Sequence, residues 1–361
     1  MIELVYSIIV IIIAAYFIWK ISSSFDVAAS YLTRNLNEGI KGATVNAVGS
    51  SLPELLISFF FLFYIGDVSG FSAGYATIIG SAMFNIALIP AFSFLYIYYK
   101  QGIAVFPTDK RIIIQDGFFL IITEIALLTI LYFGGISIIF GCSLLLLYTV
   151  YILYVIYSRG KREQENINKK LEDIGLLNNT TYMNKILELD IIGLLFKKKT
   201  LTNLQALIVL GISIIVIMGS CWVIVTSSER LSEILKINLF FITFFIAAVA
   251  SSLPDTILSI KDAKNGKYKD AFSNAYGSNI FDICIGIGLP VVLYLIINDK
   301  SEISTASSAA FNNMIFTSSV MLILFTVLIT LIYYFRNINL NRSILIISLY
   351  LIFLGTIFYI S

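Results

Sequence analysis

The chain alternates long apolar stretches with short polar connections over its 361 residues. A helix needs about 20 predominantly apolar residues to cross a bilayer. On that criterion the pattern predicts ten membrane spans, at residues 3–22, 38–64, 71–98, 113–133, 136–158, 204–227, 238–260, 269–297, 308–334 and 342–360. Less apolar residues follow the first and sixth spans, so we expect both spans to continue as long tilted helices. Ser158 to Thr200 is the one sizeable polar connection, and we interpret it as a linker.

Composition supports a membrane protein. Hydrophobic residues make up 58% of the chain and charged residues 13%, whereas soluble domains carry about 25% charged residues. The first span has neither a basic segment before it nor a small-residue cleavage site after it, so we expect a true membrane helix rather than a secretory signal.

The positive charges are distributed very unevenly. If ten spans place both termini on one side, 21 of the 24 Lys and Arg residues fall on the side of the linker. Only Arg230, Lys236 and Lys300 fall on the other side. Cytoplasmic loops carry an excess of Lys and Arg. We therefore expect a protein of the cell membrane with a cytoplasmic linker and both termini outside.

Some chemistries are excluded by what the sequence lacks. The chain contains no histidine, which rules out Ser-His catalysis and any metal site or proton relay that depends on imidazole. Cys142, Cys221 and Cys284 lie far apart in apolar spans, where we expect small packing residues rather than metal ligands.

Two polar motifs recur in the same order within the apolar pattern. "GSSLPELLIS" (Gly49 to Ser58) matches "ASSLPDTILS" (Ala250 to Ser259) at an offset of 201 residues. "IIGSAMFNI" (Ile78 to Ile86) matches "AYGSNIFDI" (Ala275 to Ile283) at an offset of 197. Five spans lie on each side of the linker, so the second copy enters the membrane from the opposite side, as in many secondary transporters.

The predicted fold is therefore an all-α membrane protein whose ten helices form two inverted five-helix repeats. We assign residues 1–158 to the first repeat, 159–203 to the cytoplasmic linker and 204–361 to the second repeat.

The first motif combines helix-breaking and acidic residues at mid-membrane depth. A proline inside a helix displaces the carbonyl four residues earlier, which for Pro53 belongs to Gly49 and for Pro254 to Ala250. Serine hydroxyls adjoin each break, and a carboxylate (Glu54 or Asp255) follows each proline. Such oxygens suit Ca²⁺, Na⁺ or K⁺ rather than soft metals.

The second motif adds further oxygens. Ser81 and Asn85 share one helix face by their i, i+4 spacing, as do Ser278 and Asp282. Two carboxylates balance one Ca²⁺, and we expect a monovalent ion or a proton to neutralise Asp282, because an unpaired buried charge is expensive. Asn85 and Asp282 could instead join helices by hydrogen bonds. Glu124, which has no counterpart in the second half, is either a structural hydrogen-bonded residue or a proton-coupling group.

At these motifs the chain resembles the cation/calcium antiporter family, the sodium/calcium exchangers, and its second repeat is most similar to the potassium-dependent branch. The resemblance implies ion ligation by both acidic positions of the first motif, by the hydroxyl and amide positions, and by two backbone carbonyls. The implied ligands are Glu54, Asp255, Ser50, Ser51, Ser251, Ser252, Ser81, Asn85, Ser278, Asp282, Ala47 and Ala248.

The chain departs from the family pattern at a few positions. Many relatives have threonine where Ser50 and Ser251 stand, and Asp255 is a shorter carboxylate than Glu. The linker lacks the length for the calcium-sensing domains of animal sodium/calcium exchangers, so we expect no regulation of that kind.

The leading hypothesis is an antiporter that exports Ca²⁺ in exchange for Na⁺, and the alternative is Ca²⁺/H⁺ or K⁺-dependent Na⁺/Ca²⁺ exchange. An intramembrane aspartyl protease using Asp255 and Asp282 is disfavoured, because that chemistry gives the duplicated motif and Glu54 no role. We expect no enzymatic activity and no cofactor. The expected partners are membrane lipid and the transported cations, with neither nucleic acid nor an obligatory protein partner.

Overall fold

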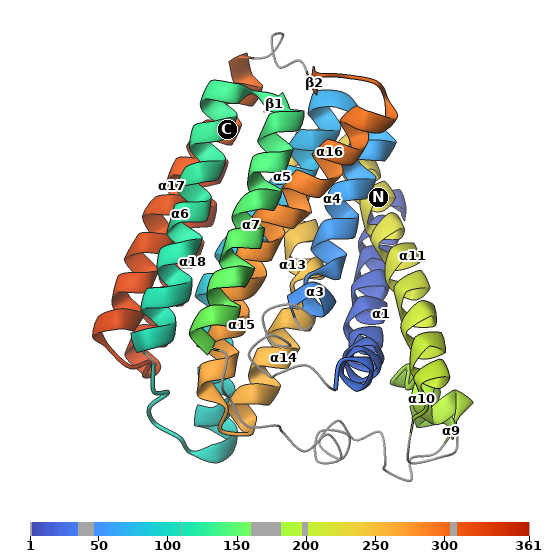
Figure 1. Ribbon diagram of the computed structural model, residues 1–361, viewed down its shortest axis with the longest axis vertical. Coiled ribbons are helices and arrows are strands. Elements are labelled where there is room, and N and C mark those ends of the chain that lie inside the picture. The colour runs from blue at the N-terminus through green and yellow to red at the C-terminus, as the bar shows by residue number, and fades with distance from the viewer. Residues whose placement is uncertain are drawn as a thin grey trace.

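Long helices form nearly all of the described chain (Figure 1). The computed structural model describes residues 2–34, 47–108, 110–159, 182–196, 201–303 and 309–360. Within these ranges nine helical segments are long and apolar enough to cross a membrane, and Leu52–Ile65 is a shorter apolar helix. These ten segments match the ten predicted spans, although residues 38–46 of the second span and 308 of the ninth lie outside the described residues.

The first half contains five long or interrupted helices. They are α1 (Ile2–Leu32), the pair α3 (Ala47–Ser50) and α4 (Leu52–Ile65), α5 (Asp67–Gln101), α6 (Lys110–Gly134) and α7 (Ile138–Arg159). Two short helices, α9 (Tyr182–Leu187) and α10 (Ile191–Leu195), belong to the predicted linker. This segment docks on α1, where the Tyr16 hydroxyl donates to the Leu187 carbonyl at 2.6 Å and Ser24 donates to the Leu189 carbonyl at 3.1 Å.

The second half repeats this plan. Its helices are α11 (Asn203–Leu235), α12 (Leu239–Ile242), α13 (Ala248–Ser251), α14 (Leu253–Lys264), α15 (Tyr268–Phe281), α16 (Gly288–Ile297), α17 (Ala309–Phe335) and α18 (Leu340–Ile360). Two π-helical turns interrupt this half, at Thr243–Ala247 before α13 and at Asp282–Ile287 after α15. As predicted, α1 and α11 are long, with 31 and 33 residues.

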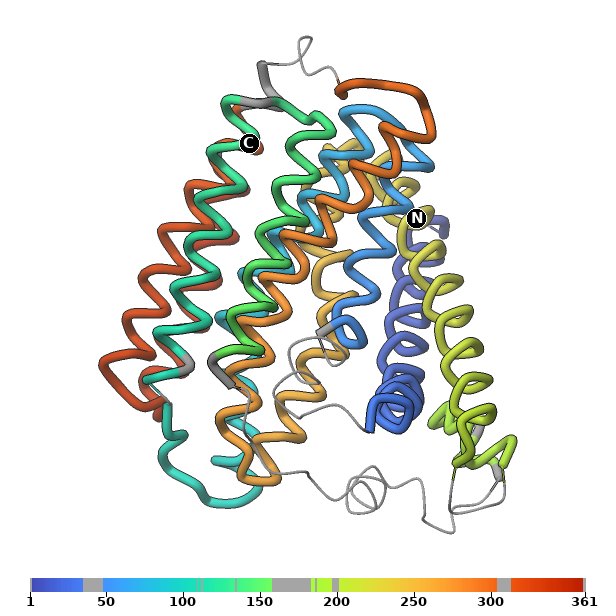
Figure 2. The backbone as a smooth tube through the Cα atoms, in the orientation of Figure 1, coloured from blue at the N-terminus to red at the C-terminus, as the bar shows by residue number. Residues whose placement is uncertain are grey.

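The two halves meet at both ends of the helix bundle. At the upper end in Figure 1, strand β1 (Ile136–Ser137) pairs antiparallel with β2 (Glu302–Ile303). At the other end, Phe106 pairs with Ile338. Figure 2 shows α1 and α11 side by side at the right, with the N-terminal end of α1 and the C-terminal end of α18 both directed upward and α9 and α10 at the bottom. This places the described ends of the chain opposite the linker helices, as an odd number of crossings per half requires.

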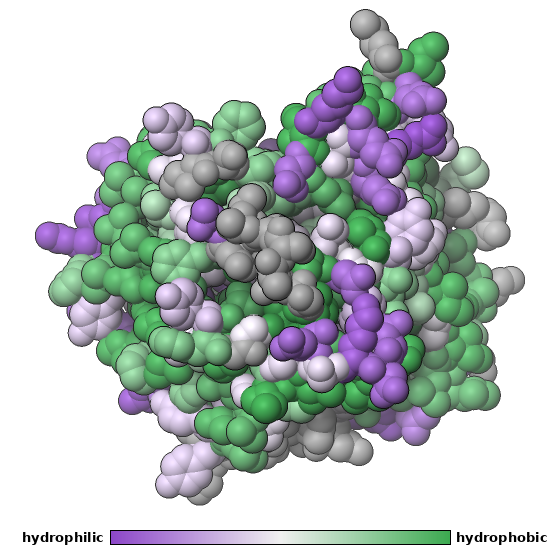
Figure 3. All heavy atoms as spheres, turned by 90° about the horizontal axis from the view of Figure 1, so that it is seen from above, coloured by the Kyte–Doolittle hydropathy of each residue, from purple (hydrophilic) through white to green (hydrophobic). Residues whose placement is uncertain are grey.

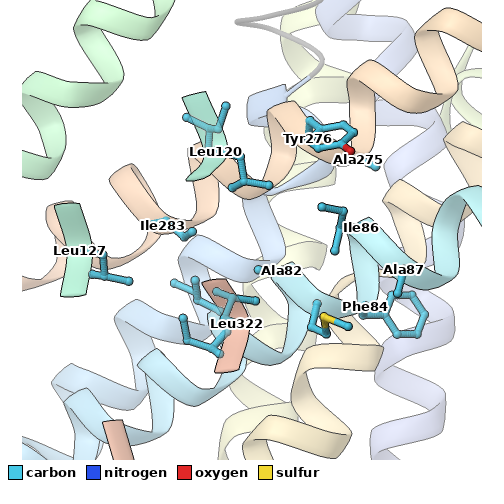
Figure 4. Packing of buried hydrophobic residues seen from close by; sticks show 14 of the residues in the cluster. Ala82, Phe84, Ile86, Ala87, Leu120, Leu127, Ala275, Tyr276, Ile283 and Leu322 are labelled. Atoms are coloured by element: carbon cyan, nitrogen blue, oxygen red, sulfur yellow. The ribbon is translucent and has the colours of Figure 1, made fainter. Parts of the chain in front are cut away.

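The apolar interior of the described residues divides into two clusters. The larger one joins α5 with helices α6, α7 and α15 to α18. Figure 4 shows Leu322 of α17 near Ala82 of α5, with Leu120 and Leu127 of α6 further away. The smaller cluster holds the facing sides of α1 and α11 together with apolar residues of α4. Helices α1 and α11 therefore form a unit whose packing is largely separate from that of the larger cluster.

Close helix approach in the larger cluster depends on small residues. A Cβ atom on Gly141 of α7 would lie 2.8 Å from the Gly288 carbonyl oxygen of α16. Helices in lipid gain little from hydrophobic burial and associate through such close packing. Large apolar side chains cover the outside, as at Phe133 and Tyr157. In the view of Figure 3 hydrophobic residues form much of the visible rim, and hydrophilic residues gather in patches on the end face.

Candidate ion-binding site

Both copies of the first motif break their helix at a serine. Ser51 (φ −95°, ψ 6°) separates α3 from α4, and Ser252 (φ −78°, ψ 0°) separates α13 from α14. Pro53 and Pro254 lie in the first turn of the helix that follows. The structure confirms the predicted helix breaks: each proline lies at the start of the helix that follows, a position where its missing N–H costs nothing.

The breaks place each acidic residue in the first turn of a helix. Glu54 lies in the first turn of α4 and Asp255 in the first turn of α14. The amide dipoles at a helix N-terminus favour negative charge. Conversely, α3 and α13 end at the breaks, and the carbonyl ends of such half-helices favour cations.

Glu54 connects the two halves. Its side chain is fully buried. Its Oε1 atom accepts hydrogen bonds at 3.4 Å from the Ser81 and Ser252 hydroxyls. Those two hydroxyls are themselves 2.8 Å apart. Three of the predicted ligands, from α4, α5 and the break before α14, therefore converge on one point.

Asp255 is held mainly by α15 of its own half of the chain. Its Oδ1 atom accepts a hydrogen bond from the Ser278 hydroxyl at 2.9 Å and another from the Asn274 side-chain amide at 3.1 Å. The Ser50 hydroxyl also faces this carboxylate. Asn274 was not among the predicted site residues. Its position four residues before Ser278 places both on one face of α15, and that spacing could have revealed it.

Asp282 completes the set of acids. Its carboxylate lies near those of Glu54 and Asp255. Its carboxylate faces the Ser51 and Ser81 hydroxyls, yet neither of its oxygens has a hydrogen-bond partner in the described segments. No proton-sharing contact between Asp282 and Asp255 is present, so the geometry does not support an aspartyl protease pair.

The remaining predicted ligands lie around these acids. The Asn85 amide donates to the Ser81 hydroxyl at 3.3 Å. The Ala248 carbonyl accepts from the Ser252 N–H and the Ser251 hydroxyl, both at 3.1 Å. Ala47, the equivalent of Ala248 at the offset of 201 residues, begins α3. The roles of both backbone carbonyls as ligands stay predictions.

Several buried oxygens in this cluster have no hydrogen-bond partner among the residues that the structure describes. They are Ser51 Oγ, Glu54 Oε2, Asn85 Oδ1, Asp255 Oδ2 and both carboxylate oxygens of Asp282. A buried polar group without a hydrogen bond costs about 1–3 kcal/mol, and more if charged. A site that gathers six such atoms needs an explanation, and hard oxygens aimed at a shared space are what Ca²⁺ and Na⁺ bind.

The carboxylates do not form a compact metal site by themselves. Among the described residues no group of three or more His, Cys, Asp or Glu side chains is placed to hold one ion. A bound ion would therefore draw on hydroxyl and amide oxygens as well. The donor set fits a weakly held, exchangeable cation better than a permanent cofactor.

Glu124 lies apart from this cluster. It is 1% exposed, and its Oε1 atom accepts a hydrogen bond from Thr326 of α17 at 2.8 Å. Its other oxygen has no partner. Of the cysteines, Cys221 packs with its sulfur 3.7 Å from the Pro53 carbonyl oxygen, while Cys142 is exposed.

Comparison with known proteins identifies the family. The family described as "Sodium/calcium exchanger protein" matches residues 6–157 and 205–359, which covers both repeats. The chain belongs to this family. Sodium/potassium/calcium exchanger 2 of Gallus gallus is 35% identical over 111 residues, which are 30% of this chain and 16% of that protein. The chain thus matches only a small part of that relative's length.

Solved structures show the same fold. The H⁺/Ca²⁺ exchanger CAX superimposes with a TM-score of 0.64 at 15% identity, covering 98% of this chain and 90% of CAX. The sodium-calcium exchanger NCX_Mj, soaked with Na⁺ and Sr²⁺, gives a TM-score of 0.57 at 22% identity and covers 97% of each chain. The predicted exchanger fold with inverted repeats is thereby confirmed.

Proposed function

We propose that this exchanger-family chain is a secondary active antiporter that exports Ca²⁺ in exchange for Na⁺ at the site around Glu54 and Asp255. The observation that carries the proposal is a set of six buried oxygens, drawn from both repeats, that have no hydrogen-bond partner within the described part of the chain. Their acids, hydroxyl and amide all belong to the two duplicated motifs.

Charge balance supports a cation as the occupant. Glu54, Asp255 and Asp282 are fully buried, and the described ion pairs all lie elsewhere, for example between Lys20 and Glu188. An uncompensated charge inside a membrane protein is expensive. One Ca²⁺ balances two carboxylates, and the third is left for Na⁺, K⁺ or a proton.

The packing supports alternating access by movement of α1 and α11. The two helices are joined near both of their ends, where Arg34 donates to Asn203 at 3.0 Å and Arg230 pairs with Glu3 at 3.3 Å. Their contacts with α4 and with the segment before α14 are largely apolar. A tied pair on an apolar surface can slide past the site helices without breaking many hydrogen bonds.

The same oxygens would serve Na⁺ and Ca²⁺ in turn. Because both ions prefer hard oxygens, occupation by one excludes the other and makes their fluxes mutually dependent. The proposal includes ligation by all twelve predicted positions and repeat boundaries at residues 158 and 204. It also includes location in the cell membrane with a cytoplasmic linker and external termini, action without a protein partner and the absence of enzymatic activity.

The second candidate is Ca²⁺/H⁺ exchange or K⁺-dependent Na⁺/Ca²⁺ exchange. It is favoured by Asp282, whose two carboxylate oxygens find no hydrogen-bond partner in the part of the chain that the structure describes and would accept a proton or a K⁺ ion. In the first half the equivalent position holds Asn85, which carries no charge.

Reconstituted liposomes test both candidates. Ca²⁺ uptake is measured while a Na⁺, a K⁺ or a pH gradient is imposed one at a time. We expect a Na⁺ gradient alone to drive uptake. Uptake that needs a pH gradient, and stays at background with Na⁺ alone, would replace the Na⁺-coupled proposal with the proton-coupled one.

Two substitutions test the site itself. Glu54→Gln and Asp255→Asn keep the shape of each side chain and remove its charge, so each should reduce Ca²⁺ transport to background. Normal Ca²⁺ uptake by either variant in the same liposomes would refute the site assignment. Glu188→Gln, in the linker segment, serves as a matched charge-removing control.

A further inference from the structure

The two halves of the site hold their carboxylates differently. Asn274 and Thr77 occupy equivalent positions, because the offset of 197 residues that relates Ser81 to Ser278 also relates Thr77 to Asn274. The Thr77 hydroxyl donates to the Ala73 carbonyl at 3.0 Å, within its own helix. Asn274 instead turns its amide towards the neighbouring helix α14.

Asn274 makes a set of contacts on α14. Its Nδ2 atom lies 3.1 Å from Asp255 Oδ1, 3.4 Å from the Asp255 carbonyl oxygen and 3.2 Å from the Ser259 hydroxyl. Both the side chain and the backbone of Asp255 are thus tied to one amide. Thr77 makes no hydrogen bond of this kind to Glu54.

The lengths of the two carboxylates match this difference. Glu54 is one methylene longer than Asp255 and reaches across to Ser252 of the other half. The hydrogen bonds that Asp255 accepts from Ser278 and Asn274 both come from α15 of its own half. Asp255 is the shorter side chain, so its position depends on the neighbours that hold it. These are mainly the two residues of α15, although the Ser50 hydroxyl of the first half also faces the carboxylate.

We propose that Asn274 is a positioning residue for Ca²⁺ binding: it holds Asp255 Oδ1 and so presents Oδ2 to the cation. The inference rests on the proposed function. Oδ1 is occupied by two donors, whereas the buried Oδ2 has no hydrogen-bond partner among the described residues. Fixing one carboxylate oxygen removes the rotational freedom that a bound ion would otherwise have to restrict. The amide does this without adding a positive charge that would compete with the ion.

The test replaces Asn274 with the residue of the other half. Asn274→Thr is reconstituted in liposomes, and initial Ca²⁺ uptake is measured against Ca²⁺ concentration. Since hydrogen bonds to charged groups are among the stronger ones, we expect the KM for Ca²⁺ to rise roughly tenfold or more while the maximal rate changes little. Asn298→Thr is the matched control, because the Asn298 amide donates to the Tyr294 carbonyl at the end of α16.

A second variant separates positioning from a general effect on the fold. Asn274→Thr combined with Asp255→Glu recreates the Glu and Thr pair of the first half, so the longer carboxylate should reach without the amide. We expect a KM closer to that of the unmodified protein than the Asn274→Thr value. A general packing defect would not be repaired by lengthening a different side chain.

The outcomes are distinct. An unchanged KM for Asn274→Thr in a protein that transports Ca²⁺ overturns the inference, as does a double variant no better than the single one. An unmodified protein that transports no Ca²⁺ under any gradient overturns the proposed function itself. Asn274→Thr could also lower the melting temperature measured without Ca²⁺. In that case the KM of the double variant for Ca²⁺, compared with that of the single variant, still distinguishes positioning from a general loss of stability.

Discussion

At Gly80 helix α5 packs tightly against the second half, and adding one methyl group there should disturb ion binding. A Cβ atom at this position would lie 2.4 Å from the Phe244 carbonyl oxygen and 2.8 Å from Ala248 Cβ. Contacts of that length do not occur in proteins. The obstacle includes backbone, which cannot swing aside as the end of a long side chain can.

The size of the effect follows from the contact distances. Ordinary van der Waals contact begins at about 3.5 Å, so Gly80→Ala requires α5 and the segment before α13 to separate by roughly 1 Å. Ser81, the next residue, is 2.8 Å from the Ser252 hydroxyl, and a separation of that size breaks this contact. Overpacking costs about 1–3 kcal/mol, which corresponds to a loss of Ca²⁺ affinity of roughly 5- to 150-fold if it falls on the site.

The assay is Ca²⁺ uptake into liposomes as a function of Ca²⁺ concentration, together with melting in the presence and absence of Ca²⁺. We expect Gly80→Ala to raise the KM for Ca²⁺ and to lose most of the stabilisation that Ca²⁺ gives the unmodified protein. Gly355→Ala in α18 is the control, because a Cβ there meets nothing within 4 Å. A Gly80→Ala protein with normal KM and normal Ca²⁺ stabilisation would show that this helix contact does not define the site.

The remaining predictions concern acids outside the Glu54 and Asp255 pair. Asp282→Asn makes the second half like the first, so Ca²⁺ flux should persist while any dependence on K⁺ or pH disappears. Complete loss of Ca²⁺ flux in that variant would instead make Asp282 a direct Ca²⁺ ligand. Glu124→Gln keeps the oxygen that accepts from Thr326 and should transport Ca²⁺ normally at every pH; a flattened pH profile in the same liposome assay would identify Glu124 as a coupling group.

Much of the fold follows from the sequence because its main signals are local. Stretches of about 20 apolar residues predict the spans, and the repeated serine and proline locate the breaks at Ser51 and Ser252. The long α1 and α11 follow from the same pattern. Charge counts per loop then agree with the arrangement of the helix ends in Figure 1.

Features that depend on contacts between helices could not be predicted in the same way. Asn274 shares a face with Ser278, but that spacing does not reveal that the amide turns towards α14 rather than along its own helix, as Thr77 does. The place of Pro53 within the helix that follows the break is a second such feature. A proline inside a helix and a proline that begins a helix have the same local sequence, and neighbouring packing decides between them.

The differences between the halves bear on the transport cycle. In an inverted-repeat carrier, the outward and inward states arise when the two halves exchange conformations. If the halves were identical, the two states would have equal energies. Here Asp255 and Asn274 of the second half are equivalent to Glu54 and Thr77 of the first half. In the same way Asp282 is equivalent to Asn85. The two carboxylates are held by different contacts. Loosening the first half therefore weakens ion binding to a different extent than loosening the second half. We infer that Ca²⁺ affinity differs between the two faces of the membrane, and that Asn274 contributes to that difference.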